Sequence, residues 1–382
     1  MNQIFVLGLV SFFVDISSEM IYPVIPIFLT TIVGANVAIL GLIEGIAESA
    51  ASLLKVLSGY MSDKIGKRKI LALFGYGFSW PCKLFFVFAS SWQFVFAGRF
   101  LDRIGKGIRT APRDALIADY SVREKRGMAY GIHRAMDTFG ALTGVLVVIF
   151  IITKTTDHNY GAAFYRNIFL ISMIPALIGW LLLFAVKDRP TTIPNVQRFN
   201  MSFKSLPKRL KLFLIFTFIF ALGNSSNQFL LLRIQMETGS LLIMMLAYLI
   251  FNLVYAVMSI PFGKISDIVG PKIVLISGYL VYGIVYWLFA LKGSTQFYIF
   301  CLGLYGLYNA LTEGVEKSLV SQLAPDNIRA SMLGLHSTLS GIGLLPASII
   351  TGFLWQTFSP LVAFGFGGTL GIIAATGLLF IL

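Results

Sequence analysis

Long apolar segments alternate with short polar ones along the chain, and this alternation predicts its architecture. Each apolar segment reaches the roughly 20 residues that a helix needs to cross a bilayer core about 30 Å thick. The expected spans are residues 4–30, 36–61, 69–91, 94–119, 128–153, 163–186, 211–232, 240–264, 272–292, 296–322, 328–354 and 360–382. The pattern therefore predicts an all-α polytopic membrane protein with twelve transmembrane helices.

The polar connections differ in charge from one side to the other, which predicts the orientation. Connections 63–69 and 123–126 and the linker 187–210 are rich in Lys and Arg. Connections such as 90–93 and 237–240 lack basic residues. Because short basic loops stay in the cytoplasm, both termini are expected to be cytoplasmic. The expected location is the cytoplasmic (inner) membrane, with the chain surrounded by lipid.

Composition supports this class and excludes others. The chain of 382 residues is 57% hydrophobic and only 12% charged, about half the charge of a typical soluble domain. Its net charge of +13 falls largely in the basic loops, so no nucleic-acid partner is expected. Cys82 and Cys301 lie far apart in apolar segments, and no metal or cofactor is expected. No Walker loop or G-x-S-x-G motif suggests an enzyme.

An internal repeat divides the chain in two. "GYMSDKIGKRKI" at 59–70 is answered by "GKISDIVGPKIV" at 263–274, and residues 126–144 are answered by 329–347. The repeat predicts two pseudo-symmetric bundles of six helices, residues 1–186 and 211–382, joined by a cytoplasmic linker at 187–210. Parallel repeats of this kind enclose the substrate path in many secondary transporters.

Charged residues cluster on one expected span, residues 94–119. One helix face carries Arg99, Asp102, Arg103, Lys106, Thr110 and Arg113, with Arg109 at its edge. Each ionised residue near the bilayer centre costs about 2.5–3.5 kcal/mol, so these side chains are expected to face an aqueous crevice or paired carboxylates. The alternative is a set of static ion pairs that only fixes helix packing.

The sequence resembles the major facilitator superfamily, specifically a bacterial and archaeal subgroup. The resemblance rests on the loop pattern G-x-x-x-D-x-x-G-x-[KR]-[KR] and its second copy, and on R-x-x-x-x-x-G-x-G in the fourth span. The matching residues are Gly59, Asp63, Gly66, Arg68 and Lys69, then Gly263, Asp267, Gly270 and Lys272, and finally Arg99, Gly105 and Gly107. The resemblance implies a conformational latch at Gly59, Asp63, Gly66, Arg68 and Asp267.

Candidate functional residues fall on the spans that line the central path in this superfamily. The expected substrate-binding residues are Arg103, Lys106, Arg109, Arg113, Asn224, Asn227, Asn252 and Tyr255. The expected proton carriers are Asp15, Glu19, Asp137 and Glu316. His133 and His336 occupy repeat-related positions, and a hydrogen-bonded packing role is favoured over a pH-sensitive one.

These residues predict a proton-coupled secondary transporter of a small organic solute, anionic or zwitterionic, working by alternating access as a monomer. The alternative is a multidrug or lipid-type exporter of hydrophobic compounds, whose pocket would use the 34 phenylalanines. The cargo, the coupling ion and the direction of transport stay open at this point.

Overall fold

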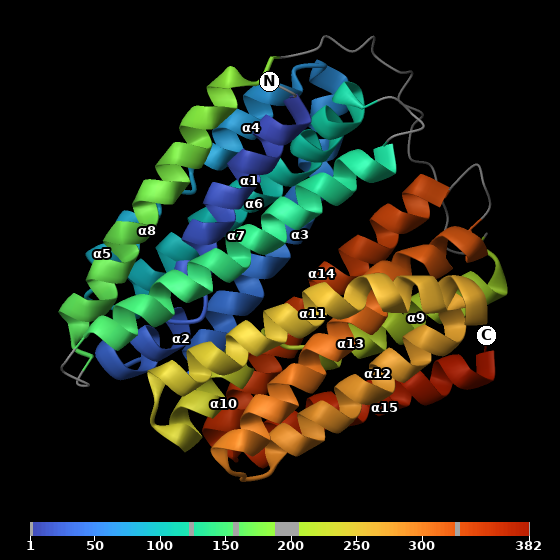
Figure 1. Ribbon diagram of the computed structural model, residues 1–382. Helices are drawn as coiled ribbons and strands as arrows, with labels where there is room; N and C mark the ends of the chain where they lie inside the picture. Colours follow the sequence, from blue (N-terminus) through green and yellow to red (C-terminus); the bar gives the residue numbers. More distant parts are fainter. Residues whose placement is uncertain (1–2, 122–125, 156–159, 188–205, 325–328, 382) are drawn as a thin grey trace. The chain divides into compact units, whose positions relative to one another are not determined.

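The computed structural model describes residues 3–121, 126–155, 160–187, 206–324 and 329–381, although the side chains of residues 63, 126, 127 and 329–331 lie outside the description. The described residues form helices and short connections, without strands. The helices (Figure 1) are α1 (Gln3–Ile21), α2 (Ile25–Ile27), the π-helical η1 (Phe28–Ile32), α3 (Val37–Ile65), α4 (Arg68–Gly77), α5 (Lys83–Val87), α6 (Trp92–Tyr120), α7 (Arg126–Lys154), α8 (Ala162–Leu182), the 3-10 turn η3 (Leu183–Ala185), α9 (Lys208–Gly223), α10 (Gln228–Thr238), α11 (Leu241–Val269), α12 (Pro271–Ala290), α13 (Thr295–Leu323), α14 (Arg329–Thr357) and α15 (Pro360–Ile381).

Within the described residues, nine helical segments are long and apolar enough to cross a membrane. The all-helical membrane class predicted from the sequence is therefore confirmed, whereas the count of twelve spans stays a prediction. The other expected spans correspond to the interrupted pair α4 and α5, to the charged helix α6, and to α13, which carries tyrosines and charged residues. A turn through Phe78–Cys82, which includes Pro81, separates α4 from α5.

The chain divides into two compact units. Unit 1 comprises Met1–Ala35 and Ile46–Gln197, and unit 2 comprises Asn36–Gly45 and Arg198–Leu382. The predicted division at 1–186 and 211–382 stays a prediction, and most of the predicted linker lies outside the described residues.

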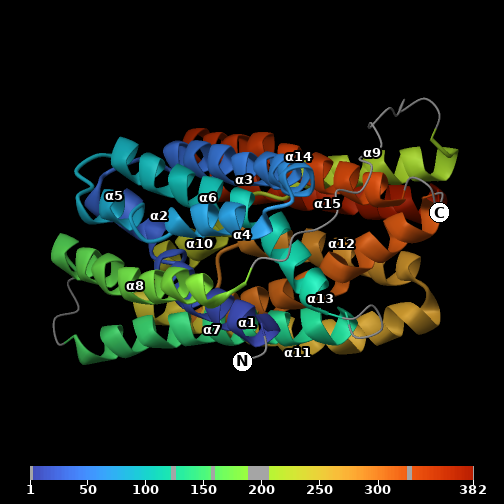
Figure 2. The same ribbon diagram turned by 90° about the horizontal axis from the view of Figure 1, so that it is seen from above.

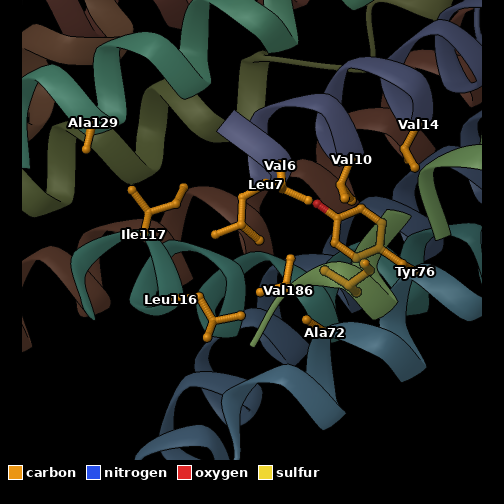
Figure 3. Packing of buried hydrophobic residues seen from close by; sticks show 11 residues of the cluster. Val6, Leu7, Val10, Val14, Ala72, Tyr76, Leu116, Ile117, Ala129 and Val186 are labelled. Carbon is orange, nitrogen blue, oxygen red and sulfur yellow. The ribbon is translucent and has the colours of Figure 1, made fainter. Parts of the chain in front are cut away.

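In unit 1, α1 packs along α7 and α8, and α4 packs along α6. A cluster of buried side chains joins α1, α4 and α6, including Leu7 and Val10 of α1, Tyr76 of α4 and Leu116 of α6 (Figure 3). In unit 2, α12 packs against both α13 and α15, and α11 packs along α13 (Figure 2). These contacts bring charged side chains together in unit 1 and aromatic side chains together in unit 2.

The helices repeat with the spacing that the sequence motifs indicate. Helices α3, α6 and α7 each have 29 residues, as do α11, α13 and α14, which begin 204, 203 and 203 residues later. Gly66 after α3 has a φ of 68°, and Gly270 after α11 has a φ of 92°. Because side chains disfavour these angles, both motif copies need glycine where the helix ends.

Candidate functional site

Helix α6 buries most of its charged row within unit 1. Arg99, Asp102, Arg103 and Arg109 are at most 9% exposed, whereas Lys106 on the same helix is exposed. Helical periodicity places these residues on one side, but the surroundings of each differ. The buried members must therefore find partners inside unit 1, since an unpaired buried charge is costly.

Glu48 of α3 is a shared partner for two of these cations. Its Oε1 lies 3.0 Å from a terminal nitrogen of Arg99 and 3.3 Å from Nε of Arg103. Asp102 lies farther away, with Oδ2 3.8 Å from Arg99 and 3.7 Å from Arg103. The Arg99 guanidinium also stacks over the ring of Tyr22, 5.0 Å from its centroid. Two carboxylates and two guanidinium groups thus form one ionic cluster, in which both guanidinium groups are buried and the Glu48 side chain is 24% exposed.

Lys83 adds a further buried cation beside this cluster. It begins α5, is 2% exposed, and lines a cavity of about 10 Å³ together with Arg99 and Asp102. The thiol of Cys82 lies 4.0 Å from Oδ1 of Asp102. Around Asp102, positive side chains therefore outnumber the carboxylates.

Arg109, one turn beyond Lys106, is held by neutral groups. It donates a hydrogen bond to the hydroxyl of Ser79 and stacks over the ring of Tyr76, 4.7 Å from its centroid. The motif glycine Gly105 explains how the helices come so close. A Cβ on Gly105 would lie 2.6 Å from the carbonyl oxygen of Gly75, so any side chain there would force α4 and α6 apart.

A chain of hydrogen-bonding side chains runs from α6 through α1 to α7. Arg113 donates to the Ser11 hydroxyl at 3.2 Å and also binds Asp114 at 2.9 Å. The Ser11 hydroxyl lies 2.8 Å from Nε2 of His133, whose Nδ1 lies 3.7 Å from Oδ2 of Asp137. Oδ1 of Asp137 is buried without a hydrogen-bond partner among the described residues. The hydroxyl, imidazole and carboxyl groups in this arrangement can pass or hold a proton, whereas the guanidinium stays positively charged.

The two acidic residues of α1 lie near this chain. Asp15 interacts electrostatically with Asp137 of α7 and with Lys106 and Arg109 of α6. The Cβ of Glu19 packs next to Gly144 of α7. Unit 1 therefore brings Asp15 and Asp137 together with the cations of α6, whereas the sequence could only propose that they meet.

In unit 2, hydrogen-bonded tyrosine and amide side chains cluster, in contrast to the charged side chains of unit 1. Between α9 and α10, Asn224 donates to the Tyr308 hydroxyl at 3.1 Å, and Asn227 accepts from the Tyr305 hydroxyl at 2.7 Å. The side chains around them include Phe220, Tyr282, Tyr286, Tyr305 and Tyr308, whose rings stack or meet edge to face.

The other predicted residues of unit 2 have different surroundings. The Asn252 amide donates to the Tyr248 carbonyl of its own helix at 3.0 Å, and the Tyr255 hydroxyl donates to the Glu313 carboxylate. Glu316 binds the Tyr279 hydroxyl at 2.9 Å and lies 3.3 Å from Nε2 of His336. His133 and His336, related by the repeat, therefore each face a carboxylate in their own unit.

One predicted latch residue, Arg68, is held by a partner that the sequence analysis missed. Arg68 lies 2.6 Å from the Asp119 carboxylate and donates to the Ala115 carbonyl at 3.0 Å, which ties the start of α4 to the end of α6. Gly59 faces α6, where a Cβ would lie 3.3 Å from that of Ala111. Asp267 is exposed, and the Asp63 side chain lies outside the described residues.

Several other residues of the site were not among the candidates. Glu48, Asp102 and Lys83 complete the ionic cluster, and Ser11 links α6 to α7. The sequence could have indicated Glu48 and Asp102 as site residues, because carboxylates are rare in apolar segments. The sequence could not have indicated Ser11, since serine is common in membrane helices. Within the described residues, no three His, Cys, Asp or Glu side chains gather as a metal site requires.

A helical chain with nine apolar segments of membrane-spanning length among its described residues, and with buried charges inside its helix bundle, is a polytopic membrane protein. The sequence profile of the Major Facilitator Superfamily matches residues 7–231 and 212–382. The chain therefore belongs to the Major Facilitator Superfamily, as its motifs predicted, and is a transporter of that family.

Known proteins support this assignment. An uncharacterized MFS-type transporter from Methanocaldococcus jannaschii is 41% identical over 390 residues, covering 100% of this chain and 95% of that protein. A solved mutant of the nucleoside transporter NupG is similar in fold, with a TM-score of 0.81, 16% identity and 100% coverage of both chains. A D-xylose-proton symporter has a TM-score of 0.79, 17% identity and coverage of 99% of this chain and 97% of the other. At these identities the two structures show the shared fold alone.

Proposed function

We propose that this protein is a secondary active transporter that moves a small anionic or zwitterionic organic solute across the cytoplasmic membrane, coupled to protons. In this proposal twelve spans form two six-helix bundles with cytoplasmic termini, and a monomer works by alternating access. The direction of net transport follows the gradients and is not part of the proposal.

The observation that carries the proposal is the surplus of positive charge on and around α6. Lys83, Arg99, Arg103 and Arg109 are buried, and fewer carboxylates lie near them, namely those of Glu48, Asp102 and Asp15. Arg109 donates to the Ser79 hydroxyl and stacks over the Tyr76 ring, and both of these groups are neutral. A surplus of cations in a low-dielectric interior attracts an anion, so Lys106, the exposed member of the row, is the residue expected to meet the solute first.

Proton coupling is supported by the arrangement around Asp137. Its carboxyl lies beside His133 and interacts with Asp15, while the cations of α6 lie across the same polar chain. A carboxyl in such a position can hold a proton in one conformation and release it when the neighbouring positive charge comes closer. Asp15, Glu19 and Asp137 are the proposed carriers in unit 1, and Glu316 beside His336 is the proposed carrier in unit 2.

Transport by purified protein in liposomes tests the proposal. A thermal-stability screen of anionic, zwitterionic and neutral solutes first selects a ligand, because ligand that binds the folded state stabilises it. Uptake of that ligand is then measured with and without an imposed pH gradient. We expect gradient-driven accumulation in the wild type and a loss of affinity in Lys106→Gln, with Lys64→Gln, an exposed lysine at the end of α3, as the matched control. Stabilisation by neutral solutes alone, or accumulation that ignores the pH gradient, would overturn the proposal.

A second function, export of hydrophobic compounds, is favoured by one observation, the aromatic cluster of unit 2. Its rings are buried, however, and hydroxyls of Tyr305 and Tyr308 are hydrogen-bonded to Asn227 and Asn224. The same ligand screen separates the two functions, because an exporter of this kind responds to many apolar compounds and is indifferent to Lys106→Gln.

A further inference from the structure

An apolar groove lies on the surface of unit 1 between α4 and α8. It has a volume of about 430 Å³ and is lined by Ile70, Leu73, Phe74, Gly77, Phe78, Pro81 and Trp180. The lining residues of α4 recur at helical spacing, so they form one face of that helix. Phe74 on this face is 66% exposed. None of these residues belongs to the charged site described above.

The backbone explains why the groove is hollow. Helix α4 ends at Gly77, and the chain then turns through Phe78–Cys82 before α5 begins. Gly77 has no side chain, and a Cβ there would lie 3.3 Å from Nε1 of Trp180. Trp180 is fixed across the groove because its Nε1 donates to the Leu73 carbonyl at 3.1 Å. The groove is therefore a built feature rather than a gap left by a mobile side chain.

One end of the groove is basic. Lys69, the neighbour of Ile70, donates from Nζ to the Phe184 carbonyl at 2.9 Å, and the Phe184 ring packs against Trp180 with centroids 5.2 Å apart. Lys67 precedes α4 and is exposed, and Lys187 is exposed two residues after the end of η3. Lys67 and Lys69 therefore lie at the start of α4, and Lys187 follows the η3 turn that contains Phe184, the residue that Lys69 contacts.

We propose that this groove binds an anionic phospholipid, with one hydrocarbon chain in the groove and the phosphate at Lys67 and Lys187. An apolar groove and an adjoining group of cations match the two parts of such a lipid. Basic residues at the end of a membrane helix attract anionic headgroups, whereas a zwitterionic headgroup gains little from them. The binding site is independent of the transported solute.

Fluorescence quenching tests the site directly because Trp180 forms its wall. Purified protein is placed in bilayers that contain a small fraction of phospholipid with brominated chains, either phosphatidylglycerol or phosphatidylcholine. The contribution of Trp180 is the difference between the wild type and Trp180→Phe. We expect brominated phosphatidylglycerol to quench Trp180 at a much lower fraction than brominated phosphatidylcholine.

Two variants separate the headgroup from the chain. Lys67→Gln with Lys187→Gln should reduce the preference for phosphatidylglycerol by about twenty-five-fold, since each lysine contributes about five-fold. The matched control, Lys208→Gln with Arg209→Gln at the exposed start of α9, removes the same charge and should leave the preference unchanged. Gly77→Leu should fill the groove and reduce quenching by both lipids.

Equal quenching of Trp180 by the two lipids in the wild type would overturn the proposal. So would an unchanged preference in the double lysine variant, or an equal loss in the α9 control. If Gly77→Leu fails to fold, the lysine variants still decide the question, because they alter exposed side chains only. Native mass spectrometry of the same variants should show one retained phosphatidylglycerol in the wild type and none in the double lysine variant.

Discussion

Replacing Glu48 by glutamine tests whether the ionic cluster of α3 and α6 holds unit 1 together. The substitution keeps the shape of the side chain and removes its charge. The Arg99 and Arg103 side chains are only 2% and 6% exposed, and both lie within 3.3 Å of the Glu48 carboxylate. Neither can reach water easily after the change, and Asp102, at 3.7–3.8 Å, is the carboxylate left beside them.

The expected magnitude follows from these distances. Two opposite charges about 4 Å apart attract by about 4 kcal/mol at an effective dielectric constant near 20. Glutamine no longer carries the desolvation cost of a buried carboxylate, which offsets part of that loss. Removing one partner of a buried ion pair usually costs about 3–5 kcal/mol, and we expect Glu48→Gln to fall in this range. Arg103→Gln added to Glu48→Gln should recover part of the loss, because one of the two uncompensated cations is then gone.

Reversible unfolding in mixed detergent micelles measures the free energy of unfolding of each variant. Asp114→Asn is the matched control, since it removes a carboxylate from Arg113 at a site where the Asp114 side chain is 39% exposed. The control should change stability by less than about 1 kcal/mol. If Glu48→Gln were as mild as this control, the cluster would not be a buried ionic network and the reasoning would fail.

Three further outcomes are expected. Asp137→Asn should abolish accumulation driven by a pH gradient and keep solute exchange across liposomes; accumulation at the wild-type level would exclude Asp137 as a carrier. Arg68→Gln and Asp119→Asn should slow transport to a similar degree, and the double variant should be no slower, because both changes break the same 2.6 Å ion pair; additive effects on the transport rate would contradict this. Gly66→Ala and Gly270→Ala should each lower the free energy of unfolding by about 1–2 kcal/mol, because both glycines have positive φ, and unchanged unfolding curves would be evidence against that strain.

The sequence predicts the helices of this protein well because apolar length is the dominant signal in a membrane helix. The expected span 240–264 is found as α11 (Leu241–Val269), and 296–322 is found as α13 (Thr295–Leu323). The expected span 211–232 ends too early. In the sequence, Arg233 suggests the end of the apolar span. Helix α10 nevertheless continues to Thr238, and Arg233 forms a 2.6 Å ion pair with Glu237 one turn later.

The charged row on α6 was predictable, but which of the available carboxylates would pair with each cation was not. Periodicity puts Arg103 and Lys106 on the same side of the helix, yet Arg103 is 5% exposed and Lys106 is exposed. The difference comes from the neighbouring helix, since the Glu48 carboxylate of α3 lies beside Arg103. A single sequence predicts on which face of its helix a side chain lies. It does not predict which residue of a neighbouring helix contacts that side chain.

The repeat allows the two units to be compared position by position, and the comparison bears on why α6 is charged. With the offset of 203 between α6 and α13, Asp102 corresponds to Tyr305 and Arg113 to Glu316, while His133 corresponds to His336. Unit 2 thus fills the position of Asp102 with a tyrosine that is hydrogen-bonded to Asn227.

At the position of Asp102, a neutral aromatic side chain is therefore sufficient to pack such a helix, and it avoids the desolvation cost of a buried ion. If the charge of Asp102 served packing alone, a neutral side chain would pack there at a lower desolvation cost, as Tyr305 does at the equivalent position of unit 2. The retention of charge in unit 1 is best explained by work that requires charge, whereas a histidine facing a carboxylate is kept in both units.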